Sequence, residues 1–397
     1  MPIQKPTIFK NKTLLDPRYM PPLNKIIDRK REMSMILNRF KPLLNDPLNY
    51  SFRCIINGSI GVGKTLIVSR IAEKFMEESR NYDRNIEVVR ISCAYRDEIQ
   101  VMQLILSQLA KKGYNTYFPS RGVSYGELLM FLQNFLESNK MHLVLILDDI
   151  DRFVERNPKT TPLLYSLTRF NDALPYSLLS LILITVNEQT IAKIKLDPAV
   201  RDFLYDIIEF KDYDVNTLAE ILKARANEAL YPNVFEDDLL WMIAKISDGK
   251  ARKAISILNS AAQYAFDNME PKIAPEHVRI VIAEYKERAE SFNVSELENL
   301  PHHTKIFLLS IVLSLKECGA VSTSMGKVMK YYKILCEEYG IKPKSRPSLN
   351  RDIKALQLSG FVEADVRNVP SGGRTTYFSV NLISLNKLEK ELRSRLK

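Results

Sequence analysis

The sequence contains four cysteines, one tryptophan and no long apolar run. Cys54, Cys93, Cys318 and Cys336 show no C-x-x-C spacing, which argues against a zinc site and favours buried thiols in a reduced cytosolic protein. No apolar run reaches the roughly 18 residues of a membrane-spanning helix. The first ten residues lack the apolar centre of a secretory signal. We therefore expect a cytoplasmic protein, with no membrane partner, whose 397 residues form two or three domains.

Positive charge is concentrated near the C-terminus. Residues 301–397 contain 17 Lys and Arg but 8 Asp and Glu, an excess of nine, whereas the whole chain has a net charge of +10. A basic terminal domain on a nearly neutral body indicates a polyanionic partner, and nucleic acid is the first candidate. A solvated basic surface without any partner is the alternative.

Short apolar runs rich in β-branched residues alternate with helical patterns over the first 210 residues. This alternation predicts an α/β fold with a doubly wound parallel sheet. Amphipathic helical patterns alone follow from about residue 214 to residue 288. The polar residues 287–299 are expected to link them to a last domain of helices that ends in two strands. The sheet strands are expected at residues 52–57, 86–92, 142–148, 180–186 and 206–210.

A phosphate-binding loop of the form G-x-x-x-x-G-K-T follows the first predicted strand and opens a predicted helix. Its glycines allow backbone N–H groups to point at phosphate oxygens, and the helix adds its positive dipole end. We expect Lys64 to reach the β- and γ-phosphates of ATP or ADP, and Thr65 to bind Mg²⁺. The residues expected around the nucleotide phosphates are Gly58, Ser59, Ile60, Gly61, Val62, Gly63, Lys64, Thr65 and Leu66.

Acidic residues end the third predicted strand. Asp148 is the expected Mg²⁺-organising residue, because strand C-termini meet beside the phosphates. Asp149 stands where a Glu often activates the attacking water, and its shorter side chain predicts slow hydrolysis. Asp151 suits a helix cap. Asn187, after the fourth strand, suits equally a water-orienting role and a helix N-cap.

In this order the motifs resemble the AAA+ ATPases, and more specifically the archaeal replication initiators of the origin-recognition/cell-division-cycle type. The resemblance covers nearly the whole chain, including an entry segment at residues 14–37 and later motifs at residues 209–213, 221–226 and 249–254. It implies an AAA+ nucleotide-binding core at residues 1–213, a helical lid at 214–290 and a winged-helix domain at 291–397.

The resemblance also implies roles for three residues near the lid. Tyr213 and Arg225 match positions that contact the adenosine end of the nucleotide. Arg252 matches the second sensor, an arginine that reaches the γ-phosphate, a task that suits a planar and permanently charged guanidinium. A solvent-facing charge is the plainer interpretation of Arg252.

Two departures from the family pattern predict a weak, switch-like ATPase. The first is Asp149 in place of Glu. The second is Ala199 where the family usually has Arg, with Phe203 near the usual place of an intersubunit arginine finger. Arg201 is a substitute candidate for that finger.

The basic C-terminal region predicts a winged helix. Leu349, Ile353 and Leu356 are spaced as the buried stripe of a helix, and two strands with a Gly-rich tip follow. Such a helix enters the major groove of DNA, and the wing tip reaches a minor groove. A protein-interaction module is the alternative, and the positive charge favours DNA. The candidate DNA-binding residues are Arg346, Ser348, Asn350, Arg351, Lys354, Gly372, Gly373 and Arg374.

The resemblance implies a second DNA contact in the ATPase domain. The best candidate is the segment at residues 114–126, where Tyr117, Phe118 and Arg121 lie between two predicted helices. These side chains suit loop anchors equally well.

The sequence therefore predicts an ATP-binding, sequence-specific double-stranded DNA-binding replication initiator, cytoplasmic and associated with the nucleoid. Its expected partners are origin DNA, other initiator copies and the replicative helicase. The alternatives are a P-loop winged-helix transcription regulator, an energy-transducing motor or clamp loader, and a nucleotide-dependent scaffold that binds only protein.

Overall fold

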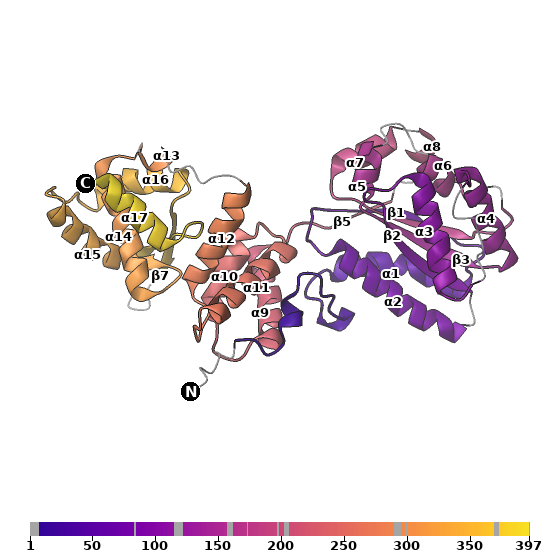
Figure 1. Ribbon diagram of the computed structural model, residues 1–397, viewed down its shortest axis with the longest axis horizontal. Helices are drawn as coiled ribbons and strands as arrows, with labels where there is room; N and C mark the ends of the chain where they lie inside the picture. Colours follow the sequence, from indigo (N-terminus) through magenta and orange to yellow (C-terminus); the bar gives the residue numbers. More distant parts are fainter. Residues whose placement is uncertain are drawn as a thin grey trace. The chain divides into compact units, whose positions relative to one another are not determined.

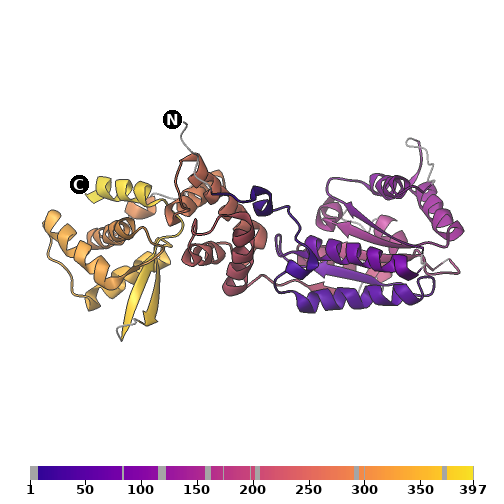
Figure 2. The ribbon, with the colours of Figure 1, turned by 90° about the horizontal axis from the view of Figure 1, so that it is seen from below.

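The structure is a computed structural model of the whole chain (Figures 1 and 2). It describes residues 8–82, 85–114, 122–156, 162–172, 174–196, 198–201, 206–289, 295–298, 300–368 and 373–396. The chain divides into two compact units, of which one is Met20–Tyr213 and the other combines Met1–Tyr19 with Asp214–Lys397. None of the described helices is both long and apolar enough to cross a membrane.

The unit Met20–Tyr213 is built on a five-stranded sheet in the order β2-β3-β4-β1-β5, with every pair parallel. The doubly wound parallel sheet is thus confirmed. Its elements are η2 (Leu23–Lys25), α1 (Lys30–Asn45), β1 (Arg53–Asn57), α2 (Lys64–Ser79), η3 (Arg80–Tyr82), β2 (Ile86–Ser92), α3 (Glu98–Lys111), α4 (Tyr125–Ser138), β3 (His142–Asp148), α5 (Ile150–Arg156), α6 (Pro162–Thr168), β4 (Leu179–Ile184), α7 (Glu188–Lys195), α8 (Pro198–Arg201) and β5 (Ile207–Glu209).

Helices cover both faces of this sheet because successive strand residues point to opposite faces. On β3, Leu143, Leu145 and Leu147 pack in one core with side chains of α3 to α7. Ile146, between them, lines a cavity with residues of α2 on the other face. All seven β3 residues are buried, and the strand is apolar from Leu143 to Leu147, between the histidine that begins it and the aspartate that ends it.

The second unit begins with the lid, four helices labelled α9 (Val215–Ala229), α10 (Asp237–Ile246), α11 (Ala251–Asp267) and α12 (Pro275–Ala289). Residues 8–19, placed by the sequence in the core domain, pack on this lid instead. Backbone N–H groups of Lys10 and Asn11 donate to Ala229 O at 2.8 and 2.9 Å, and η1 (Lys12–Leu15) contacts α9 and α11. The lid is therefore completed by residues that precede the whole sheet unit in the sequence.

The same unit ends in a winged-helix domain around a three-stranded sheet in the order β6-β8-β7. The two expected strands are found as β7 and β8, and β6 and α17 are additions. A short helix, α13, lies inside the expected polar linker and buries Leu297 in the domain core. The elements are α13 (Ser295–Glu298), α14 (His302–Cys318), β6 (Thr323–Ser324), α15 (Met325–Glu338), η4 (Pro347–Leu349), α16 (Asn350–Leu358), β7 (Glu363–Asn368), β8 (Arg374–Ser379) and α17 (Leu385–Leu396).

Candidate functional site

The loop between β1 and α2 curls as a phosphate-binding loop requires. Gly58, Gly61 and Gly63 have φ angles of 148°, 92° and 96°, a backbone region that favours glycine. Lys64, the first residue of α2, is buried and donates from Nζ to the carbonyl oxygens of Gly58 and Ser59, at 2.9 Å for Ser59. The ammonium therefore lies over the loop, where Lys64 is expected to meet phosphates.

Residues after β5 close one side of this loop. A Cβ built on Gly58 would lie 2.3 Å from Phe210 O, and one on Gly63 would lie 3.3 Å from the Tyr213 hydroxyl. Ser59 Oγ donates to Asp212. Burial raises the pKa of Tyr213, so its hydroxyl is a neutral donor beside the loop.

Arg29 holds Tyr213 in this position, a role that the sequence analysis did not assign. Its guanidinium lies 4.0 Å from the centre of the Tyr213 ring, donates to Lys211 O, and bonds Glu32 Oε1 at 2.9 Å. The Arg29 side chain is only 4% exposed. The only available signal was its place in the entry segment of the family resemblance, because its partners lie far along the chain.

The carboxyl end of β3 brings Asp148 next to the loop. Burial and the neighbouring Asp149 raise the pKa of Asp148, whereas a hydrogen bond from the Thr65 hydroxyl and the charge of Arg90 lower it. Asp148 also accepts a 3.0 Å hydrogen bond from the Asp149 N–H, and its Oδ2 is 3.7 Å from Arg90. A hydroxyl and a carboxylate are oxygen ligands that suit Mg²⁺. Thr65 and Asp148 are thus together, as the motif predicts.

Asp149 is exposed and has a left-handed φ of 56°. Ser92 Oγ, at the end of β2, donates to its Oδ2 at 2.9 Å. Its carboxylate is thereby directed toward β2, the edge strand of the sheet.

Asp151 and Asn187 have structural roles at the same edge. Asp151 was expected to cap a helix but does not. It is buried and accepts hydrogen bonds from Thr185 Oγ1 at 2.5 Å and Val186 N at 2.9 Å, which ties α5 to the end of β4. Asn187 Oδ1 accepts from Thr190 N at 2.7 Å, the N-cap interaction for α7. A water-orienting role for Asn187 stays a prediction.

Two arginines of the lid differ in their surroundings. Arg225 of α9 donates to Leu14 O and Tyr19 O, both at 3.1 Å, and lies 4.7 Å from the centre of the Tyr19 ring. It therefore holds the N-terminal segment on the lid, and its predicted adenosine contact stays a prediction. Arg252, in the first turn of α11, is exposed.

Some predicted residues lie outside the described part of the chain. These are Tyr117, Phe118, Arg121, Phe203 and Gly372. Arg201 is described, and is exposed at the end of α8.

The predicted DNA-reading helix comprises η4 and α16. Leu349, Ile353 and Leu356 are buried, so the predicted apolar stripe faces the domain core. The candidate DNA-binding side chains on this helix and at its N-cap are all exposed, namely Arg346, Ser348, Asn350, Arg351 and Lys354. The wing strands pair as far as Asn368↔Arg374, which puts the exposed Arg374 beside the tip, next to Gly373 with a φ of 89°.

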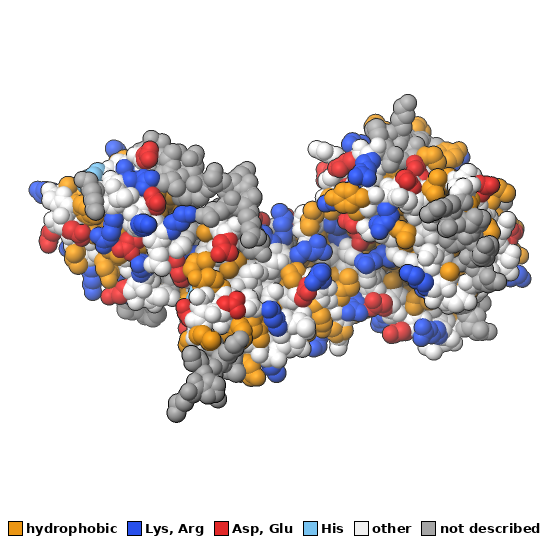
Figure 3. Space-filling model, viewed as in Figure 1, with side chains coloured by type: hydrophobic (Ala, Val, Ile, Leu, Met, Phe, Trp, Pro, Cys, Tyr) orange, Lys and Arg blue, Asp and Glu red, His pale blue; other side chains and the backbone are white. Residues whose placement is uncertain are grey.

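Asp352 anchors this helix from its inner side, a second role that sequence reasoning missed. The buried carboxylate accepts from Thr304 Oγ1 at 2.6 Å and pairs with Lys344 Nζ at 2.9 Å. Asp352 thus faces inward while its neighbour Arg351 faces solvent. On the face drawn in Figure 3, blue Lys and Arg side chains lie across the winged-helix domain at the left, with acidic side chains among them.

Comparison with known proteins adds three family matches. The Cdc6 AAA+ ATPase-type lid domain matches residues 219–282, and the Cdc6 C-terminal winged-helix domain matches residues 295–389. The NB-ARC domain matches residues 40–156, which contain the phosphate loop and Asp148.

Whole-chain relatives agree with these matches. An ORC1-type DNA replication protein of Thermococcus kodakarensis is 28% identical over 383 residues, 94% of this chain and 88% of the relative. The crystal structure of Cdc6p from Pyrobaculum aerophilum has a TM-score of 0.84 at 28% identity and covers 98% of both chains. The Aeropyrum pernix ORC1 protein, solved in complex with DNA, has a TM-score of 0.61 at 25% identity, covering 98% of this chain and 97% of that one.

Proposed function

Because this chain belongs to the archaeal ORC1/Cdc6 family of AAA+ replication initiators, we propose that it is an ATP-dependent, sequence-specific double-stranded DNA-binding protein that marks replication origins. The observation that carries the proposal is the combination of two sites in one chain. One is the phosphate loop with Thr65 beside Asp148. The other is the exposed polar and basic side of η4 and α16, with Arg374 near the wing tip.

The first site would hold ATP or ADP with Mg²⁺. Lys64 and the loop N–H groups would meet the phosphates, and Thr65 and Asp148 would hold the cation. Tyr213, fixed under Arg29, would lie toward the adenosine end, and Arg252 would sense the γ-phosphate from the lid. Bound Mg²⁺ would supply charge neutralisation between the phosphates.

The nucleotide acts in this proposal as a switch more than as fuel. Asp149, shorter than the usual Glu and bonded to Ser92, and Ala199 in place of the usual Arg both support slow hydrolysis. Steady-state turnover should stay below about one per second, a low value among enzymes. A faster rate in a phosphate-release assay would instead favour a motor or clamp loader.

The partners follow from the second site and from the family. The solved A. pernix ORC1 relative is bound to DNA, and the exposed basic residues of this chain support the same ligand. Most of the affinity would come from phosphate contacts, and sequence choice from a few side chains and DNA deformability. The further partners that we propose are other copies of the chain on DNA and the replicative helicase.

The test is a selection of genomic fragments from the source organism by the purified protein. It is run with ATP·Mg²⁺ and with ADP·Mg²⁺, each at two salt concentrations. We expect enrichment of a repeated element at one or a few loci that fire as origins. Enrichment confined to a gene's promoter would favour a transcription regulator. Binding without any preferred sequence would contradict origin marking.

Variants connect the selection to the residues. Arg351→Ala combined with Arg374→Ala should remove the enrichment, because both exposed cations belong to the proposed DNA surface. Arg393→Ala is the control, since Arg393 pairs with Glu389 and Glu338 inside the same domain. Unchanged DNA affinity in the double variant would support a scaffold that binds only protein.

A further inference from the structure

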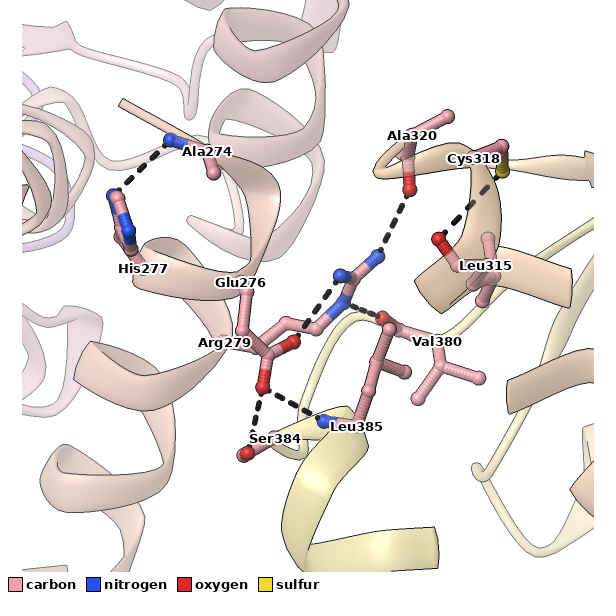
Figure 4. Close-up of polar contacts among 10 residues, drawn as sticks. All are labelled: Ala274, Glu276, His277, Arg279, Leu315, Cys318, Ala320, Val380, Ser384 and Leu385. Carbon is pink, nitrogen blue, oxygen red and sulfur yellow. Dashed lines mark hydrogen bonds and ion pairs between the residues drawn. The ribbon is translucent and has the colours of Figure 1, made fainter. Parts of the chain in front are cut away.

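Arg279 of the lid helix α12 is buried against the winged-helix domain, with 2% of its side chain exposed. Its Nε donates to Val380 O at 2.6 Å, and its Nη2 is 3.4 Å from Ala320 O (Figure 4). Ala320 precedes β6 and Val380 follows β8. One guanidinium therefore holds two separate segments of the winged helix through backbone atoms.

Glu276, one turn earlier on α12, makes a second set of contacts across the same junction. Its Oε1 accepts from Ser384 Oγ at 2.6 Å and from Leu385 N at 3.0 Å, at the first residue of α17. Its Oε2 is 3.4 Å from Arg279 Nη1, which provides the buried guanidinium with a counter-charge. A carboxylate at a helix N-terminus is also favoured by the helix dipole.

A third contact joins the lid to the wing. Lys245, in the last turn of α10, pairs with Glu363 at 2.6 Å and lies 3.5 Å from Asp365, both on β7. This pair is more exposed than Arg279 and therefore contributes less. Together the three contacts fix the winged helix to the lid at β6, β7, β8 and α17.

Separating the two domains would exchange the hydrogen bonds of Arg279 and Glu276 for bonds to water. Hydrogen bonds of charged groups still contribute net stability after this exchange, more than those between neutral groups. The contact between the lid and the winged helix should therefore stay closed while the domains are folded. Since α12 packs on α11, and α11 carries Arg252, the proposed nucleotide sensor and α16 belong to one connected body.

We propose that Arg279 is a positioning residue that locks the winged helix to the lid, so that the nucleotide sensed by the lid sets the affinity of α16 for DNA. The regulatory part rests on the proposed function. The lock itself does not, because it follows from the contacts of Arg279 and Glu276 alone.

A distance measurement tests the lock without DNA. Nitroxide labels are placed in the full-length chain at the exposed positions of Asp267→Cys on α11 and Lys330→Cys on α15. Cys318→Ser removes the one native thiol that is not buried. Burial raises the pKa of the Cys54 and Cys93 thiols to about 12, and it raises that of Cys336 as well, so these stay unlabelled.

Electron–electron double resonance should give one narrow distance distribution, the same in ATP·Mg²⁺ and in ADP·Mg²⁺. Arg279→Met keeps an apolar stem but no donors, and should at least double the width. The width for Arg279→Lys, which keeps one donor group, should lie between those of wild type and Arg279→Met. Circular dichroism shows whether Arg279→Met is folded at the working temperature. If it is not, the comparison of distribution widths between Arg279→Lys and wild type decides whether the lock exists. A broad wild-type distribution, or variants with the wild-type width, would overturn the lock.

The ratio of DNA dissociation constants in ADP·Mg²⁺ and ATP·Mg²⁺ tests the regulation. We expect a ratio of at least about fivefold in either direction for wild type, the lower range of allosteric coupling. It should fall toward one in Arg279→Met and recover partly in Arg279→Lys. Arg393→Ala should keep the wild-type ratio.

The outcomes separate the two proposals. A wild-type ratio retained by Arg279→Met would overturn the regulatory role. A wild-type chain that binds no DNA would contradict the proposed function, and the distance distributions would still decide whether Arg279 locks the two domains.

Discussion

Gly58 leaves no space for a side chain at the start of the phosphate loop. Its φ is 148°, and an added Cβ would meet Phe210 O at 2.3 Å. Gly113, with a φ of 95°, has nothing within 4 Å of the same position and serves as a matched control. Gly58→Ala should lower the free energy of unfolding by about 3 kcal/mol, through steric overlap in addition to backbone strain. Gly113→Ala should cost only about 1 kcal/mol. Equal losses in urea unfolding would contradict this.

His142 makes the stability of the nucleotide-binding unit depend on pH. It is buried at the start of β3, with Nδ1 2.7 Å from Ser177 O and Nε2 2.9 Å from Ser180 Oγ. Burial lowers its pKa from 6.5 to about 4. Between these values the unfolded chain takes up a proton that the folded chain does not, so stability falls as pH falls.

The expected slope from His142 is up to about 1.4 kcal/mol per pH unit between pH 6.5 and pH 4. Urea unfolding at half-unit pH steps measures it. His142→Gln should be less stable at pH 7, because its hydrogen bonds change, yet its stability should fall less steeply with acid. Parallel pH profiles for the two proteins would show that another group titrates.

Residues of local motifs could be predicted from the sequence, and residues with distant partners could not. Lys64, Thr65 and Asp148 were identified because a phosphate loop and a strand end are set by neighbouring residues. The role of Arg29 depends on Lys211, 182 positions away, and that of Asp352 on Thr304, 48 positions away. No spacing in the sequence records such pairs.

The helix α16 offers two adjacent residues with opposite orientations. Arg351 is exposed on the proposed DNA side, whereas Asp352 is buried against Thr304 and Lys344. Arg351→Ala should weaken DNA binding by about 1–3 kcal/mol and leave thermal stability nearly unchanged. Asp352→Ala should lower the free energy of unfolding by about 2–4 kcal/mol, because it leaves the buried Thr304 hydroxyl without an acceptor.

Fluorescence anisotropy with labelled DNA and thermal unfolding separate these effects. If Arg351→Ala destabilised the domain as much as Asp352→Ala, α16 would be oriented differently from the structure. If neither variant changed DNA affinity, another surface would bind DNA.

The strands of the parallel sheet were predicted to within one or two residues. The strands β3 and β4 are buried at every position and are therefore nearly continuous apolar runs. The elements of the winged-helix domain were harder to predict. The two-residue β6 is too short to leave a pattern, and it exists through pairing with β8. The helix α17 did leave a pattern in the sequence, an apolar stripe whose buried residues are Leu385, Leu388, Leu392 and Leu396. This stripe was missed because the segment also contains many charged residues. The linker prediction failed at Leu297, a single apolar residue that enters the core.

For the whole molecule, the excess charge of the last quarter predicts strongly salt-dependent DNA binding. Each phosphate contact contributes about 0.9 to the slope of log affinity against log salt. Arg374→Ala should therefore reduce the steepness by about one, while Arg393→Ala, engaged with Glu389, should leave it unchanged. Titrations at four or more salt concentrations measure the slope. A slope near zero in the wild type would exclude the winged helix as a phosphate-binding surface.

The packing of the N-terminal segment on the lid has a consequence for synthesis. Leu14 is held by Arg225, which is made 211 positions later. The sheet unit between them is continuous in sequence and is complete by Tyr213. Domains generally fold as they emerge from the ribosome. The segment around Leu14 is therefore made before the sheet unit, yet it can pack on the lid only after α9 has been made.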